Sequence, residues 1–107
     1  MAIIGQRAAV LCSLGDNLIY SVPSASTDQL TISFSSVDNS PITIKVYHVK
    51  QGNSGALPHS AKDLLASPLI IDTTPVFISE LNVSSLDDIV VNSSVDVKLV
   101  VNINGGL

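Results

Sequence analysis

The chain has 107 residues, a net charge of −4 and an apolar fraction of 46%, yet only 13% of its residues are charged. This length predicts one domain, which we place over residues 1–107. The high apolar content excludes an intrinsically disordered chain. The abundance of Val and Ile, which alternate with Ser and Thr, and the absence of Trp favour β-sheet over a helical bundle.

The charge pattern excludes several classes of partner. The basic residues are scattered along the chain with no two adjacent, so we expect no nucleic-acid partner. No apolar run reaches the roughly 18 residues of a membrane-spanning helix, and we expect no membrane partner. No segment has the pattern of a secretory leader, so we expect the protein to be made and used without secretion.

In the first half of the chain, we expect an N-terminal arm over residues 1–7 and strands over 8–13 and 18–22. The segments 29–37 and 42–49 alternate between apolar and polar residues with a period of two, which predicts two half-buried strands. Asp38-Asn39-Ser40-Pro41 between them is a strong turn signal. The pair therefore predicts a β-hairpin.

In the second half, residues 61–66 are expected to form one helical turn that ends before Pro68. Strands follow at 69–71, at 76–79, from Ile89, and over 95–103. The last two are expected to form a hairpin, with Val97 and Leu99 facing inward. The same parity places a second set of residues on its outer face: Asp88, Val90, Lys98 and Val100.

Seven to eight short strands with frequent turns indicate the fold class. The pattern predicts an all-β protein, an antiparallel β-sandwich or jelly roll.

Chemistry-bearing residues form no recognisable site. Cys12 reads as a small apolar core residue. His48 and His59 are isolated, and we expect them at the surface or at a hairpin edge. We interpret Asp87-Asp88 as a turn from a loop into a strand. The alternative is that the two carboxylates form half of a calcium site. We therefore expect no enzyme, no catalytic residue, no cofactor and no metal.

The surface is the more informative feature. Adjacent apolar pairs on strands must send one member away from the core, because neighbours point to opposite faces. Few charges cover this outer face, which is typical of a subunit packed into a larger assembly. The candidate interface residues are Ile3, Ile4, Val90 and Val100, and a homo-oligomer is expected.

Two stretches add a resemblance. Leu18-Ile19-Tyr20-Ser21-Val22-Pro23, followed by Leu30-Thr31-Ile32-Ser33-Phe34, resembles the opening of a group of small virion proteins of tailed bacteriophages. The segment from Asp38 to Tyr47 is similar to the hairpin that follows in that group.

The end of the chain is similar to the close of the same group, over residues 81–91 and 93–101. Leu86-Asp87-Asp88 replaces the group's small-Gly-Asp turn, which is a departure from its pattern. The resemblance covers about residues 18–103. It implies capsid-decorating, neck, tail or baseplate proteins without catalysis, and it carries no ligand residues.

The sequence thus favours a bacteriophage virion structural protein, a capsid decoration or cement subunit bound to other virion proteins, above all the major capsid protein. Its location would be the virion, after synthesis in the host cytoplasm. A neck, tail or baseplate subunit is one alternative. A carbohydrate-binding or adhesion module and a bacterial structural or secretion-apparatus subunit are the others.

Overall fold

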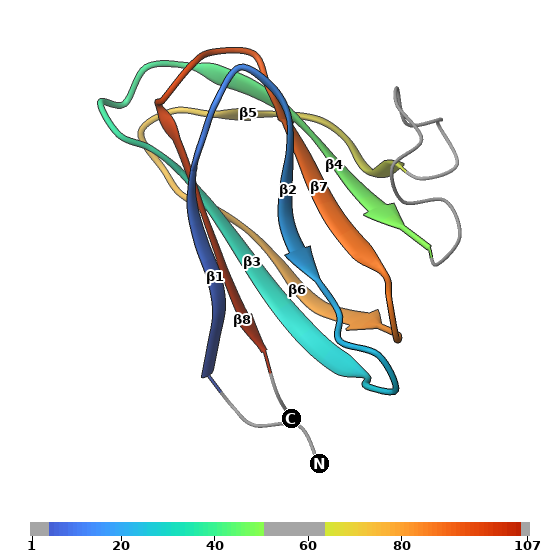
Figure 1. The fold of residues 1–107 in the computed structure, drawn as a ribbon. Coiled ribbons are helices and arrows are strands. Elements are labelled where there is room, and N and C mark those ends of the chain that lie inside the picture. Colours follow the sequence, from blue (N-terminus) through green and yellow to red (C-terminus); the bar gives the residue numbers. More distant parts are fainter. Residues whose placement is uncertain (1–4, 51–63, 106–107) are drawn as a thin grey trace.

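The structure, a computed structural model, describes residues 5–50 and 64–105. Within these residues the chain is all-β, as predicted, with eight strands and no helix (Figure 1). The strands are β1 (Gly5–Cys12), β2 (Gly15–Ser21), β3 (Asp28–Ser36), β4 (Ile42–Val49), β5 (Leu64–Ile71), β6 (Val76–Val83), β7 (Asp88–Ser93) and β8 (Leu99–Gly105).

The strands form two four-stranded antiparallel sheets. Sheet A has the order β1-β8-β3-β6, and sheet B has the order β2-β7-β4-β5. The pairs β1·β8, β2·β7, β3·β6 and β4·β5 are nested along the chain, so its two halves run antiparallel to each other throughout. Only β4 and β5 are consecutive strands of one sheet. Nested pairing wrapped into two sheets is the jelly-roll arrangement of a β-sandwich.

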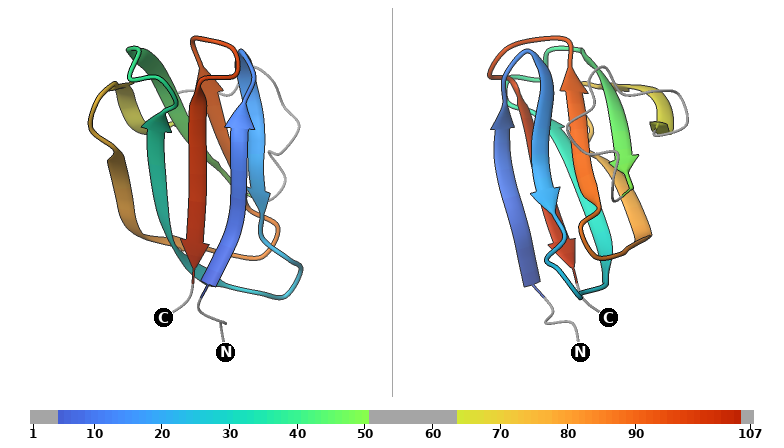
Figure 2. Two further views of the ribbon diagram at one scale, coloured as in Figure 1. Left: turned by 90° about the vertical axis from the view of Figure 1, so that its left-hand side faces the viewer. Right: turned by 45° about the vertical axis from the view of Figure 1, so that its right-hand side comes forward.

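The core lies between the sheets and is built from alternate residues of each strand. Phe34, Ile32 and Leu30 point inward from β3, as the alternation predicts. The opposite sheet contributes aliphatic side chains, and all are fully buried: Ile42, Ile44, Val46, Ile89 and Val91. Figure 2 shows the two layers side by side. Burying these β-branched and aromatic side chains is the main stabilising term of such a fold.

Both predicted hairpins are wrong. β3 belongs to sheet A and β4 to sheet B, so residues 37–41 cross between the sheets. The same is true of β7 and β8, which separates Asp88 and Val90 from Lys98 and Val100. The physical reason is that alternation requires each strand to bury one face, and both a hairpin and a crossing between facing sheets satisfy that requirement.

The expected inward position of Val97 is also wrong, whereas Leu99 is buried as predicted. β8 begins at Leu99, and Val97 lies in the preceding turn with 57% of its surface exposed. The buried Ser93 hydroxyl donates to the Val95 carbonyl at 2.7 Å and turns the chain. The Val97 amide then donates to the Cys12 carbonyl at 2.9 Å. The polar turn ends the apparent alternation.

The expected helical turn is corrected as well: residues 64–66 belong to β5, and residues 61–63 lie outside the described part. β5 is the edge strand of sheet B, and two register shifts interrupt its pairing with β4. Pro68 has no amide proton to donate, and an edge strand with irregular pairing tolerates that loss.

Residues 5–7 of the expected N-terminal arm belong to a strand instead. Gly5 pairs with Gly105 and Gln6 with Asn104, so residues 5–7 belong to β1. Backbone pairing with β8 therefore anchors a segment whose sequence shows no alternation. Ile3 and Ile4 lie outside the described residues.

Candidate functional site

The outer face of sheet A is uncharged across three consecutive rows of paired residues. One row crosses all four strands as Ala9, Asn102, Ser33 and Phe77. The row on one side consists of Leu11, Val100 and Ser35. The row on the other side consists of Gln6, Asn104 and Thr31. We call these ten residues the uncharged face. On β6 the charged residue nearest to this face is Glu80, which lies at a bulge in this edge strand.

The orientation of this face follows from the core. Cys12, Leu99 and Val101 are fully buried, so their neighbours Leu11 and Val100 point the other way. Leu11 is 52% exposed and Phe77 62% exposed. Gln6 Nε2 donates to Asn102 Oδ1 at 3.3 Å, which joins two neighbouring rows. The face therefore combines small hydroxyls and amides with exposed apolar side chains.

The outer face of sheet B has a different character. Asp16, Asn92 and Lys45 form one of its rows, and Asn92 Nδ2 donates to Asp16 Oδ1 at 2.8 Å. The Ser21 hydroxyl donates to Asp88 Oδ1 at 2.6 Å on the same side. Charges spread over a solvent-facing sheet are ordinary for a soluble antiparallel sandwich. The outer face of sheet B also exposes Leu18 and Ile70, so sheet A is distinguished by its lack of charge and not by its exposed apolar side chains.

The candidate interface residues fall into three groups. Val100 lies on the uncharged face, half-buried between Leu11 and Ser35. Val90 lies opposite Leu18 and Tyr47 on the outer side of sheet B, but only 6% of its surface is exposed. Val90 thus offers almost no contact area. Ile3 and Ile4 lie outside the described residues.

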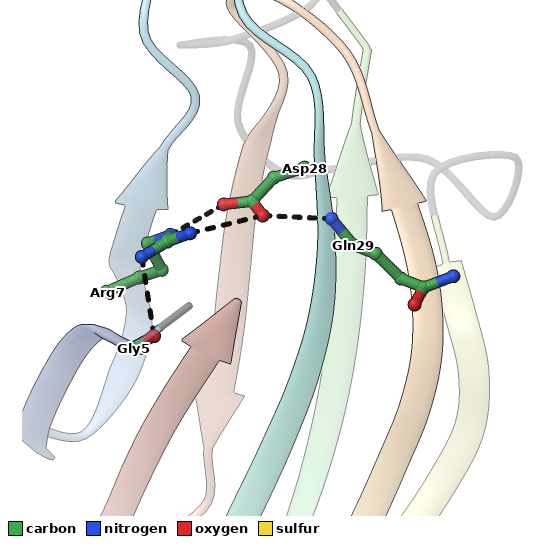
Figure 3. Close-up of polar contacts among 4 residues, drawn as sticks. All are labelled: Gly5, Arg7, Asp28 and Gln29. Carbon is green, nitrogen blue, oxygen red and sulfur yellow. Dashed lines mark hydrogen bonds and ion pairs between the residues drawn. The ribbon is translucent and has the colours of Figure 1, made fainter. Parts of the chain in front are cut away.

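An ion pair between Arg7 and Asp28 lies at the end of the sandwich where β1 begins and β8 ends (Figure 3). Arg7 Nε donates to Asp28 Oδ2 at 2.7 Å, and Arg7 Nη1 donates to the Gly5 carbonyl. The side chain of Asp28 is almost wholly buried. The hydrogen bond to Asp28 raises the pKa of Arg7, and burial raises the pKa of the nearby Tyr20.

The pair closely covers Gly105. A Cβ atom at this position would lie 2.7 Å from both Arg7 Nε and Asp28 Oδ2. Arg7 is the extra residue at a register shift in β1, so it does not follow the alternation of its neighbours. We therefore assign the pair to closing this end of the sandwich.

A second buried polar pair joins β4 to the β6–β7 loop at the same end. His48 Nε2 lies 2.8 Å from Asp87 Oδ2, and the Ser84 amide donates to the same oxygen at 3.0 Å. Both side chains are largely buried, which corrects the expected surface or hairpin-edge position of His48. β4 lies between β7 and β5, so His48 belongs to an inner strand. His59 lies outside the described residues.

The adjacent acidic residues do not act together. Asp87 accepts from Ser84 within its own loop, whereas Asp88 accepts from Ser21 across the outer face of sheet B. This arrangement supports the predicted turn over half of a calcium site. Among residues 5–50 and 64–105 no three His, Cys, Asp or Glu side chains gather as metal ligands would.

Cys12 lies fully buried in the core, as predicted. Burial raises the pKa of its thiol to about 11, so the thiol is protonated at neutral pH. A buried, protonated thiol is a poor nucleophile.

No helix within the described segments is long and apolar enough to cross a membrane. Comparison with protein-family models, curated proteins and solved structures gave no match. The uncharged face is thus the feature on which a functional proposal rests.

The alternation of the strands could have revealed part of this face. Thr31, Ser33 and Ser35 occupy the outward positions of β3, and Asn102 and Asn104 those of β8. The sequence does not predict that β8 pairs with β3. Arg7 and Asp28 are distant in sequence, and only a bulge in β1 brings them together.

Proposed function

We propose that this chain is a non-enzymatic structural protein of a bacteriophage virion, a decoration or cement subunit that stabilises the capsid. The observation that carries the proposal is the uncharged face of sheet A. It is flanked by neither Lys nor Arg on its own rows, and it exposes Leu11 and Phe77. Protein interfaces share this depletion of charge at their centre.

The mechanism we propose is mechanical. Burying hydroxyls and amides costs less free energy than burying charges, provided that the partner supplies hydrogen bonds. A flat face of this kind can therefore dock on a capsid protein without stripping ions of water. Many copies on one particle would add weak contacts into strong attachment through avidity. Self-association of the chain belongs to the same proposal.

The fold supports this reading by analogy alone. Jelly rolls occur in viral capsid domains and also in lectins, and one fold serves many functions. A neck, tail or baseplate subunit would use the same face with fewer copies per particle.

A glycan-binding module is the second candidate, and one observation favours it. Phe77 is an exposed aromatic ring that pairs with Ser33, and Asn102 lies next along the row. An aromatic ring offers a stacking surface for sugars, and hydroxyls and amides can hydrogen-bond to sugar hydroxyls.

Reconstitution tests the structural proposal. The purified chain is added to particles of the encoding virus that lack it, and bound copies are counted by mass spectrometry relative to the major capsid protein. Hundreds of copies indicate decoration, and six to a few dozen indicate a neck, tail or baseplate position. Absence of binding to any particle contradicts the proposal, and retention on a glycan array supports the second candidate.

Two variants locate the contact. Phe77→Asp places a charge on the uncharged face and should reduce binding strongly. Ile70→Asp is the matched control, because Ile70 is 65% exposed on the outer side of sheet B. Equal losses in both variants would show that the uncharged face is not the interface. Removal of residues 1–4, which precede β1, tests Ile3 and Ile4 separately.

A further inference from the structure

A group of exposed aliphatic residues lies at the other end of the sandwich from the Arg7–Asp28 pair. Leu14, Val37 and Val97 occupy the β1–β2, β3–β4 and β7–β8 loops, and each exposes more than half of its surface. These loops lie together at the top of the views in Figure 2. We call the three residues the apolar tip.

Hydrogen bonds hold the three loops side by side. The Val97 amide donates to the Cys12 carbonyl and the Val37 amide to the Lys98 carbonyl, each at 2.9 Å. The Leu14 amide donates to Asp96 Oδ1 at 3.1 Å. The three exposed residues therefore lie on loops that are bonded to one another at one end of the sandwich.

The backbone of Val97 is strained. Its φ is 47°, in the left-handed region that a β-branched residue rarely adopts. Its side chain is exposed, so packing within the chain does not offset the strain. The Val97 amide bonds to the Cys12 carbonyl, but the exposed side chain adds little packing, and backbone strain of this kind clusters at sites that bind a ligand or partner.

Four exposed carboxylates lie at the same end of the sandwich as the tip. Asp16, Asp38, Asp72 and Asp96 are all exposed at this end, next to the three loops or in the neighbouring β5–β6 loop. Lys98 is the basic residue of these loops, and its Nζ lies 2.6 Å from Asp38 Oδ2. An acidic rim disfavours both an anionic lipid surface and the same tip of a second copy.

We propose that the apolar tip docks into a protein partner whose surface presents an apolar recess flanked by lysine or arginine side chains. The aliphatic side chains would fill the recess, and the four aspartates would match its basic rim. This inference is independent of the uncharged face and of the proposed virion function.

An NMR titration of the ¹⁵N-labelled full chain tests the proposal with three peptides of equal length, rich in Leu and Lys, in Leu and Glu, or in Ser and Lys. The Leu/Lys peptide should shift the amides of residues 13–15, 37–39 and 95–98. Its affinity should fall as salt rises from about 0.03 to about 0.3 M, because the Debye length shortens. The other two peptides should bind much more weakly.

Several outcomes would overturn the proposal. Shifts that map outside the tip, or equal binding of the Ser/Lys peptide, would show that the apolar residues do not matter. Tip shifts with anionic vesicles, or with rising concentration of the chain itself, would assign the tip to lipid or to a second copy.

Val97→Asn and Leu86→Asn form a matched pair of variants. Leu86 also has a positive φ, of 65°, and a 43% exposed side chain, but it lies in the β6–β7 loop at the opposite end. Asn tolerates this backbone conformation in both places. Val97→Asn should weaken the Leu/Lys peptide roughly tenfold, as loss of an interface anchor does, and Leu86→Asn should leave it unchanged. Equal effects in both variants would contradict the proposal.

Discussion

The two ends of the sandwich distribute polar and apolar groups in opposite ways. At the end where β1 begins, Asp28 and Asp87 are buried and paired with Arg7 and His48. At the other end the carboxylates are exposed, and Leu14, Val37 and Val97 face solvent. The first end uses charge to close the core, because a buried charge must find a partner. The second end leaves apolar surface uncovered, which stabilises nothing within the chain and is available to a partner.

Asp87→Ala should show the largest effect at the closed end. The change removes the acceptor of both the Ser84 amide and the His48 ring, and the largely buried His48 ring loses this partner. We expect unfolding in urea to lose about 2–4 kcal/mol. Asp88→Ala is the control, because Asp88 accepts from the exposed Ser21 hydroxyl on the outer face of sheet B, and its loss should cost within about 1 kcal/mol. Equal losses would mean that the His48–Asp87 pair does not close this end.

Gly105→Ala should come next. The added methyl group would lie 2.7 Å from Arg7 Nε and from Asp28 Oδ2, so the ion pair must shift. Overpacking of this kind costs about 1–3 kcal/mol, measured by urea unfolding. In an Arg7→Ala background the same substitution should cost less, because one of the two side chains that it displaces is gone and Asp28 is no longer held by the ion pair. An identical cost in both backgrounds would show that the ion pair is not what limits the space.

Val97→Asn should act in the opposite direction at the apolar tip. Asn adopts positive φ more readily than a β-branched residue, so relief of strain should raise the unfolding free energy by about 1 kcal/mol. A thermal melt in the absence of any peptide measures this effect. A lower melting temperature would show that Val97 stabilises the turn rather than straining it.

Asp38→Asn should have the smallest effect, and that effect depends on pH. The hydrogen bond from Lys98 holds the pKa of Asp38 below its ordinary 3.8. A carboxyl whose pKa is lowered by folding stabilises the fold above its unfolded pKa, and this contribution decreases as the pH falls below about 4. The melting temperatures of parent and variant should differ slightly at neutral pH and converge in acid. The pair is exposed, so salt should shrink the difference too. A difference that grows in acid would contradict this assignment.

Much of the fold could be predicted from the sequence, because strand alternation is a local property. Residues 42–49 form a strand as predicted, and the inward positions of β3 and β4 follow from their period of two. The core position of Cys12 was equally predictable from its apolar character.

The two candidate sites were harder to predict from the sequence. The outward hydroxyls of β3 are visible in the sequence, but their union with Asn102 and Phe77 into one face requires the pairing of β3 with β8 and β6. The apolar tip requires three loops, far apart in the chain, to meet.

The sequence by itself determined that the protein is all-β, where most strands lie, and which of their residues face the core. Only the tertiary structure decided which strands pair, that residues 37–41 and 94–98 cross between sheets, and that Val97 leaves the strand pattern. The reason is physical. A period of two specifies that one face of a strand is buried, whereas the partner that buries it is chosen by contacts between residues distant in the chain.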